Sequence, residues 1–143
     1  MASEVRNKII RGTFGKLWVN NIHMANIKSF ELKATMNYEE IDINGNLCKQ
    51  YRYTGYSLSG TMVLHKIDSY ITALVKDGMK SGQMPDIKFV SSLSDPDADG
   101  SDRIEVYDVV FDETTLMQFE NGSIGEESVP FKAGGYNLID INI

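Results

Sequence analysis

The feature that most constrains this chain is a long stretch of alternating residues that leads into an Asn-Gly turn. Apolar Phe30, Leu32, Ala34, Met36 and Tyr38 alternate with polar Glu31, Lys33, Thr35 and Asn37. A period of two is typical of a β-strand with one buried face and one polar face. Asn44–Gly45 favours a hairpin because both residues tolerate a positive φ, and residues 57–64 alternate again. We therefore predict one long hairpin.

The register of this hairpin depends on the length of its loop. A two-residue loop at 44–45 would place Leu32 opposite Ser57, so the apolar faces of the two strands would not match. A three-residue loop at 44–46 places Leu32 opposite Leu58, and we prefer it because the buried face sets the register. A β-bulge between the loop and the domain would make the same correction.

The predicted hairpin is longer than the domain that carries it. The seventeen residues 27–43 would extend about 56 Å as a strand, whereas a compact domain of 143 residues has a diameter of roughly 37 Å. We therefore interpret the chain as a single domain, 1–143, in which residues 39–53 project as an inter-subunit arm. A mobile surface loop is the alternative. The candidate contact residues of the arm are Ile41, Ile43, Asn44, Gly45, Leu47, Tyr51 and Tyr53, and the preferred register puts Tyr51 and Tyr53 on its polar side with Ile41 and Ile43.

Most of the remaining chain also has the pattern of strands. Further strands are expected near residues 17–20, 87–93, 104–111, 116–119 and 128–132. One helix is expected where apolar residues follow helical spacing, namely Ile67, Tyr70, Ile71, Leu74, Val75 and Met79. Asp68 is its expected N-cap, and Gly78 or Gly82 its expected end. Many strands with a single helix predict a mainly β domain, a small sandwich or barrel with the helix on its flank.

Charge and cysteine content limit the classes of function. The net charge is −6, from 14 basic and 20 acidic residues, and such a balance repels nucleic-acid phosphates. The single cysteine, Cys48, excludes an intrachain disulfide and fits a reducing compartment. The longest apolar run, Tyr70 to Val75, is far shorter than the roughly 20 residues that span a bilayer. No apolar stretch near the N-terminus has the form of a signal peptide, so we expect a cytosolic, soluble chain with no membrane-spanning segment.

Residues 95–100 imitate the start of a calcium loop, with Asp95, Asp97, Asp99 and Gly100 in suitable positions. The twelfth position should be a bidentate glutamate, but it is Val106, and Glu105 comes one place early. Asp, Pro, Gly and Ser are turn residues, so a polar hairpin loop is the better interpretation. We expect no metal site.

Groups that could support catalysis are few and scattered. The only histidines are His23 and His65, and a pair of either with Cys48 has nothing to orient it. The pair Glu126–Glu127 is expected to be a solvated turn or strand end rather than an acid and base. We expect no catalytic residue and no cofactor, so the chain is not expected to be an enzyme. The alternative function is a monomeric β-barrel that binds a small ligand, which would need an apolar cavity.

Short motifs, taken in order, resemble one known family over nearly the whole chain. They are Gly15–Val19, Met24–Lys28, Thr54–Tyr56, Ser59–Thr61, Arg103–Val109 and Glu126–Phe131. Their order and spacing resemble the tail-tube proteins of contractile phages, in the branch found in defective prophages and phage-tail-like bacteriocins of Gram-positive bacteria.

This resemblance implies two packed antiparallel sheets with one flanking helix. It also implies a structural protein that forms homohexameric rings stacked into a hollow tube, a conduit for DNA or ions. The partners it implies are other copies of the chain, a tail sheath protein outside the tube, and baseplate and tail-terminator proteins, with DNA only as passing cargo. The implied location is the bacterial host cytoplasm during assembly and the virion or tail-like particle afterwards.

The polar face of the long hairpin is the expected lining of such a tube. The candidate lumen residues are Glu31, Lys33, Thr35, Asn37, Ser57, Ser59 and Thr61. These side chains are small, hydroxylated or balanced in charge, and they include neither the arginine nor the aromatic platform that grips a nucleic acid. A solvent-facing outer sheet with the same alternation is the alternative.

Overall fold

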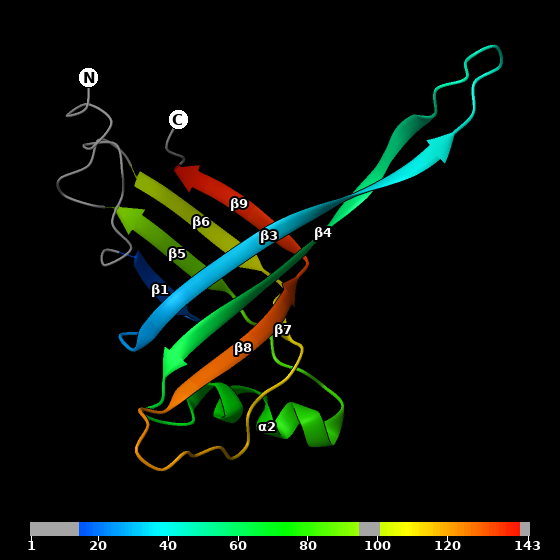
Figure 1. The fold of residues 1–143 in the computed structure, drawn as a ribbon. Helices are drawn as coiled ribbons and strands as arrows, with labels where there is room; N and C mark the ends of the chain where they lie inside the picture. Colours follow the sequence, from blue (N-terminus) through cyan, green and yellow to red (C-terminus); the bar gives the residue numbers. More distant parts are fainter. Residues whose placement is uncertain (1–14, 95–100, 141–143) are drawn as a thin grey trace.

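The computed structural model describes residues 15–94 and 101–140, which form two antiparallel sheets and one helix (Figure 1). The mainly β fold predicted from the sequence is confirmed. One sheet has the strand order β2-β1-β5-β6-β9, with β1 Gly15–Val19, β2 Ile22–His23, β5 Phe89–Ser94, β6 Ser101–Tyr107 and β9 Gly135–Asp140. The other has the order β3-β4-β8-β7, with β3 Ile27–Ile41, β4 Gln50–His65, β7 Val110–Phe111 and β8 Glu126–Ala133.

The core lies between the two sheets. Its fully buried side chains come from alternate positions of both: Leu17, Val19, Phe89 and Val106 from one, and Met62, Val129 and Phe131 from the other. The rings of Phe89 and Phe131 meet edge to face, with centroids 5.0 Å apart. Each such side chain contributes roughly 1.5–3 kcal/mol by leaving water, so this layer holds the sheets together.

Helix α2, Tyr70–Ser81, follows β4 and packs on the core through Ile71 and Val75. It ends at Gly82, which adopts φ 83° and donates its N–H to the Gly78 carbonyl at 2.8 Å. The predicted helix is therefore confirmed, with Gly82 as its end. Its N-cap position is Ser69 rather than Asp68, although Asp68 Oδ1 still accepts a hydrogen bond from the Tyr70 N–H at 3.2 Å.

Two strand predictions were wrong. The expected strand 104–111 divides into β6 and β7, which lie in different sheets, because Asp108 adopts φ 53° and interrupts the extended chain between them. The expected strand 116–119 lies instead in the irregular connection between β7 and β8. Strands β2 and β9 were not predicted. The calcium-like segment 95–100 lies outside the described residues.

The hairpin pairs differently from the register preferred above. Leu32 lies opposite Gly60, and Leu58 lies opposite Ala34. The predicted parity, in which even positions face even positions, is correct near the domain. This parity arises from a β-bulge, the alternative considered above, and not from a three-residue loop. Thr54 is the extra residue of the bulge, between the pairs Asn37–Gly55 and Tyr38–Tyr53. The connecting loop is also longer than predicted, with eight residues, 42–49, between β3 and β4.

Candidate functional site

The β3–β4 hairpin extends well beyond the rest of the molecule (Figure 1). Strand β8 pairs with β4 from His65 only as far as Leu58. Beyond that point β4 is paired with β3 alone, so residues 35–57 form a two-stranded ribbon, which we call the ribbon. The predicted arm, residues 39–53, is its outer part. A two-stranded hairpin is marginal in water by itself, which makes a covered ribbon more favourable than a bare one.

One face of the ribbon is aromatic and exposed. Met36, Tyr38, Tyr51, Tyr53 and Tyr56 lie on the same side as the core-facing residues of β3 and β4, and we call them the tyrosine face. Their exposed fractions range from 51% to 65%. The expected placement of Tyr51 and Tyr53 on the polar side was wrong, because the extra residue Thr54 turns both side chains over.

The tyrosine face is organised by contacts among its own side chains. The rings of Tyr38 and Tyr53 meet edge to face with centroids 5.9 Å apart, and the Tyr38 hydroxyl lies 3.7 Å from Met36 Sδ. At the base of the ribbon, Tyr56 contacts Tyr136 of β9 edge to face, at 6.1 Å. Clusters of exposed apolar side chains of this kind mark interaction sites.

The other predicted arm residues lie at the outer end of the ribbon. Ile41 ends β3, and Ile43, Asn44, Gly45 and Leu47 lie in the connecting loop, where Leu47 is fully exposed. Gly45 adopts φ 81° inside a turn closed by a 3.0 Å bond from the Asn46 N–H to the Ile43 carbonyl. Lys49 Nζ pairs with Asp42 Oδ1 at 2.5 Å. The tip therefore has a defined turn and one neutralised charge pair.

The seven candidate lumen residues share one face of the four-stranded sheet, opposite the core. The register places Glu31 opposite Thr61, Lys33 opposite Ser59 and Thr35 opposite Ser57. Lys33 Nζ lies 3.1 Å from Glu31 Oε1, so the two central charges of this face neutralise each other.

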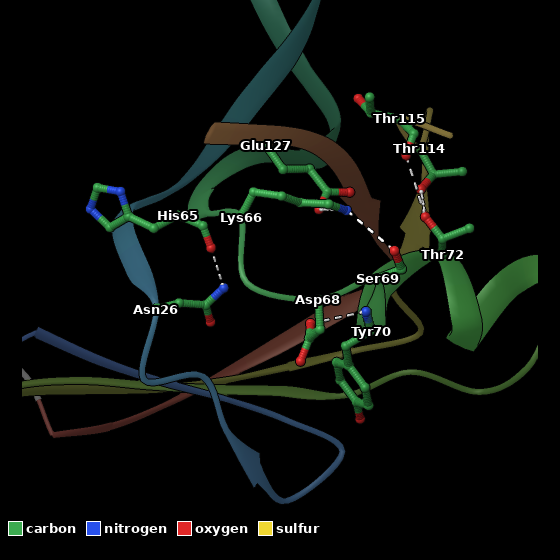
Figure 2. Close-up of polar contacts among 10 residues, drawn as sticks. All are labelled: Asn26, His65, Lys66, Asp68, Ser69, Tyr70, Thr72, Thr114, Thr115 and Glu127. Atoms are coloured by element: carbon green, nitrogen blue, oxygen red, sulfur yellow. Dashed lines mark hydrogen bonds and ion pairs between the residues drawn. The ribbon is translucent and has the colours of Figure 1, made fainter. Parts of the chain in front are cut away.

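A second exposed apolar surface lies on the β7–β8 connection, residues 112–125, which we call the apolar loop. Leu116, Met117, Phe119 and Ile124 are 70–88% exposed there. The start of the loop is held to helix α2, since the Thr72 hydroxyl lies 3.0 Å from that of Thr114 (Figure 2). The apolar loop therefore presents large side chains to the surroundings from an anchored base.

Beside the apolar loop lies a hollow of about 320 Å³ with a buried carboxylate in its wall. Glu127 is only 4% exposed, so the expectation of a solvated Glu127 was wrong. Its Oε2 lies 3.5 Å from Lys66 Nζ, whereas its Oε1 is buried and has no hydrogen-bond partner among the described residues. Figure 2 shows Lys66 approaching one side of this carboxylate. Burial of an unpaired carboxylate oxygen is unfavourable, so Glu127 Oε1 would be stabilised by a donor that displaces part of the side chains covering it.

The neighbouring Glu126 has a different environment. Lys28 Nζ lies 2.7 Å from Glu126 Oε1, and this hydrogen bond lowers the pKa of Glu126 below its ordinary value. Glu126 is thus held as a carboxylate by a partner on β3, and the two adjacent glutamates do not form an acid–base pair.

The groups considered for catalysis are not brought together. His23 packs on Trp18 with ring centroids 5.3 Å apart, the His65 carbonyl accepts a 2.6 Å bond from the Asn26 amide (Figure 2), and Cys48 is exposed at the tip of the ribbon. In residues 15–94 and 101–140, no three His, Cys, Asp or Glu side chains are grouped to hold a metal ion. No helix in this part of the chain is long and apolar enough to cross a membrane.

Sequence comparisons point to one family. Residues 4–140 match the profile of a family described as phage tail tube protein. The chain is also 32% identical, over 133 residues, to the phage-like element PBSX protein XkdM of Bacillus subtilis (strain 168), an alignment that covers 92% of this chain and 90% of that protein.

Structural comparisons show the same fold in chains of two tube-containing particles. A chain in the cryo-EM structure of the anti-feeding prophage cap, which terminates the tube of that particle, aligns with a TM-score of 0.75 at 12% identity, covering 93% of this chain and 92% of that one. A chain in the sheath–tube complex of an extracellular contractile injection system, in its extended state, aligns with a TM-score of 0.71 at 13% identity, covering 99% and 98%. At these identities the similarity is one of fold.

Proposed function

Since this chain belongs to the phage tail tube protein family, whose members are structural proteins, we propose that it forms homohexameric rings that stack into the inner tube of a contractile tail or tail-like particle. The tube is a conduit for DNA or ions. A tail sheath protein surrounds it, and baseplate and tail-terminator proteins close its ends. The subunit assembles in the bacterial host cytoplasm and ends in the virion or tail-like particle.

The observation that carries this proposal is the exposed tyrosine face of the ribbon. A monomer would leave all five side chains of the tyrosine face at least half exposed, although Tyr56 contacts Tyr136 at the base of the ribbon. A neighbouring subunit that covers this face gains apolar burial and rigid aromatic contacts. The ribbon, including the arm 39–53, is therefore the inter-subunit element of the proposal.

Ring closure uses the free edges of the four-stranded sheet. Strands β3 and β7 are its two edge strands, and the unpaired N–H and C=O groups of an edge can bond to the next subunit. A contact between unlike edges is heterologous, and a rotation of about 60° between neighbours closes such contacts into a ring of six. We propose that the four-stranded sheets join in this way into one barrel, with the candidate lumen residues inside.

This orientation puts helix α2 on the outside. The helix packs on the core through Ile71 and Val75, while Lys76 and Lys80 are exposed on its other side. We propose that this polar side faces the sheath. The structural relative in the sheath–tube complex supports the general arrangement, since it shares the fold over almost its whole length.

Negative-stain microscopy combined with size-exclusion chromatography tests the proposal. Concentrated wild-type protein should give stacked rings or tubes with a central channel. A stable 16.0 kDa monomer that carries a bound small ligand would overturn it in favour of the β-barrel alternative. Phe89 and Phe131 fill the centre of the space between the sheets, so a ligand would have to bind in a peripheral hollow, such as the one of about 610 Å³ lined by Leu17, Ile27 and Phe30.

A further inference from the structure

We propose that the hollow at Glu127 receives the side chain of Arg52 from a second copy of this chain, so that the ribbon of one subunit docks on the apolar loop of the next. The inference rests on the proposed tube and identifies a contact within it. It assigns a role to the buried carboxylate, which the fold alone does not require.

The chemistry of the hollow selects a cationic group with several N–H donors. Its lining contains three carboxylates, Glu120, Glu126 and Glu127, and one ammonium group, Lys66. The Lys66 contact to Glu127, at 3.5 Å, is long for a charge-assisted hydrogen bond, and Glu127 Oε1 lacks any donor. A guanidinium is the side chain best suited to a carboxylate that needs a further donor, because it is planar and offers five N–H groups.

The rim of the hollow suits the stem of the same side chain. Leu116, Met117, Phe119 and Ile124 belong to its lining, and all four are largely exposed. Arginine buries its methylene stem on apolar surface while its charged end seeks a polar partner. A hollow lined by both apolar side chains and carboxylates therefore fits an arginine better than it fits a small anion or a purely apolar group.

Arg52 is the basic residue of the ribbon whose side chain is free to bind another subunit. The ribbon contains two basic residues, Lys49 and Arg52. Lys49 is engaged by Asp42 at 2.5 Å, while the guanidinium of Arg52 has no ion pair or hydrogen bond with any other described residue. Arg52 lies opposite Glu39 and beside Ile41 on the face away from the tyrosines. Ile41 is 37% exposed and can meet the apolar rim when Arg52 enters the hollow.

The two surfaces lie far apart on one subunit. Figure 1 shows the ribbon extending from one side of the sandwich and the β7–β8 connection near helix α2 on the opposite side. Arg52 pairs with Glu39, five residues beyond the last β3 position backed by a β4–β8 pair, hence roughly 17 Å outside the domain. Contact between unlike surfaces at opposite ends is heterologous, and it repeats from copy to copy without closing when no rotation returns the last copy to the first, which is the property that stacking requires.

The test is a double-mutant cycle on assembly. Arg52→Ala and Glu127→Gln should each raise the protein concentration needed for tubes by about tenfold or more, as loss of one partner of a buried charge pair does. The double variant should lose little beyond either single variant. Lys80→Ala, which removes a cation from the exposed side of helix α2, is the control and should assemble like wild type. Urea unfolding of Glu127→Gln checks that its fold is intact.

A second measurement does not depend on tubes. A mixture of Arg52→Ala chains, which keep the hollow, with Glu127→Gln chains, which keep the arginine, retains one intact contact per pair and should form heterodimers in sedimentation velocity. If wild-type protein forms tubes but the two substitutions have additive effects, or no effect, on the concentration needed for assembly, the Arg52–Glu127 contact is overturned and the proposed tube is not. If heterodimers form but wild-type protein gives no tubes, the Arg52–Glu127 contact is supported and the proposed tube is overturned. If neither heterodimers nor tubes form, the contact and the tube are both overturned.

Discussion

Tyr38 and Tyr53 lie directly opposite each other on the ribbon, with ring centroids 5.9 Å apart and planes inclined at 64°. They meet because Thr54 is an extra residue in β4, which brings Tyr53 and Tyr51 onto the side of Tyr38. A single bulge thus decides whether the aromatic side chains of the outer ribbon form one face or are divided between two.

Deletion of Thr54 should therefore abolish tube formation without unfolding the domain. Removing one residue from a strand turns every side chain beyond it to the other face, so Tyr51 and Tyr53 would leave the tyrosine face. Thr54→Ser is the matched control, because it keeps the extra residue and the hydroxyl that donates to the Asn37 carbonyl. Electron microscopy reads out assembly, and urea unfolding reads out the domain. Normal tubes from the Thr54 deletion would show that the tyrosine face is not a contact surface.

Replacing Ile41 and Ile43 with serine should weaken stacking and spare the fold. Both side chains are at least 37% exposed in the single chain, so their loss costs the domain little. Each substitution would reduce the free energy of assembly by about 1–3 kcal/mol where the isoleucine is buried in the tube, and this loss recurs at every subunit. Tube length distributions by microscopy measure the effect, with Lys80→Ala on helix α2 as the control. Unchanged tube lengths in the double-serine variant would count against the arm 39–53 as an inter-subunit element.

Gly60→Ala should destabilise the domain itself. A Cβ at Gly60 would clash with the Glu31 backbone oxygen and would lie 2.7 Å from the Phe131 ring, so the β3–β4 pair and the core would have to shift. Overpacking of this kind typically costs about 1–3 kcal/mol. Urea unfolding should show the loss, while Ser59→Ala, at the adjacent exposed position, should unfold like wild type. A urea midpoint equal to that of wild type for Gly60→Ala would mean that β3 and the core accommodate the added methyl group without loss of stability.

The pair Glu105–Tyr107 should make stability depend on pH at both extremes. The Tyr107 hydroxyl donates to Glu105 Oε2 at 2.5 Å, and this bond lowers the pKa of Glu105 below 4.5 and raises that of Tyr107 above 10.0. The stabilisation from Glu105 is complete above pH 4.5 and is lost as the pH falls through the folded-state pKa. That from Tyr107 is complete below pH 10.0 and is lost as the pH rises. Urea midpoints of Tyr107→Phe should vary less with pH than those of wild type in both windows, and equal slopes would exclude the bond.

The parts of the fold that sequence analysis predicted are those with sustained periodicity. The alternation from Phe30 to Tyr38 predicted β3 and its core-facing side, and the apolar stripe around Ile71 and Val75 predicted helix α2. Both signals recur over several residues and reflect one buried face. The excess length of the hairpin also followed from counting residues, since strand length and domain diameter scale differently.

The features that escaped prediction each depend on a single residue or on distant packing. The extra residue Thr54 leaves the alternation on either side intact, so only the paired register shows it. Asp108 breaks a strand through its backbone conformation, which the residue type does not specify. Glu127 is buried beside Lys66, in the wall of a hollow that residues of the apolar loop also line, although a carboxylate beside another carboxylate resembles a solvated strand end.

Introducing arginine on the polar face of the four-stranded sheet tests whether that face lines the channel. Thr35 and Thr61 lie on the face opposite the core, Thr35 opposite Ser57 and Thr61 opposite Glu31, so Thr35→Arg with Thr61→Arg should leave folding and ring closure intact. Two positive charges per subunit would be added to a wall whose central charges, Glu31 and Lys33, neutralise each other. If the wall surrounds a polyanion, its attraction for that polyanion should rise and should weaken with added salt.

Passage of DNA through the tube should then slow at low salt and recover at high salt, measured by ejection from a DNA-carrying particle. A matched variant, Asp77→Arg on the exposed side of α2, also raises the charge of each subunit by two and should leave passage unchanged. Unaltered ejection from tubes of normal appearance would place these strands away from the lumen.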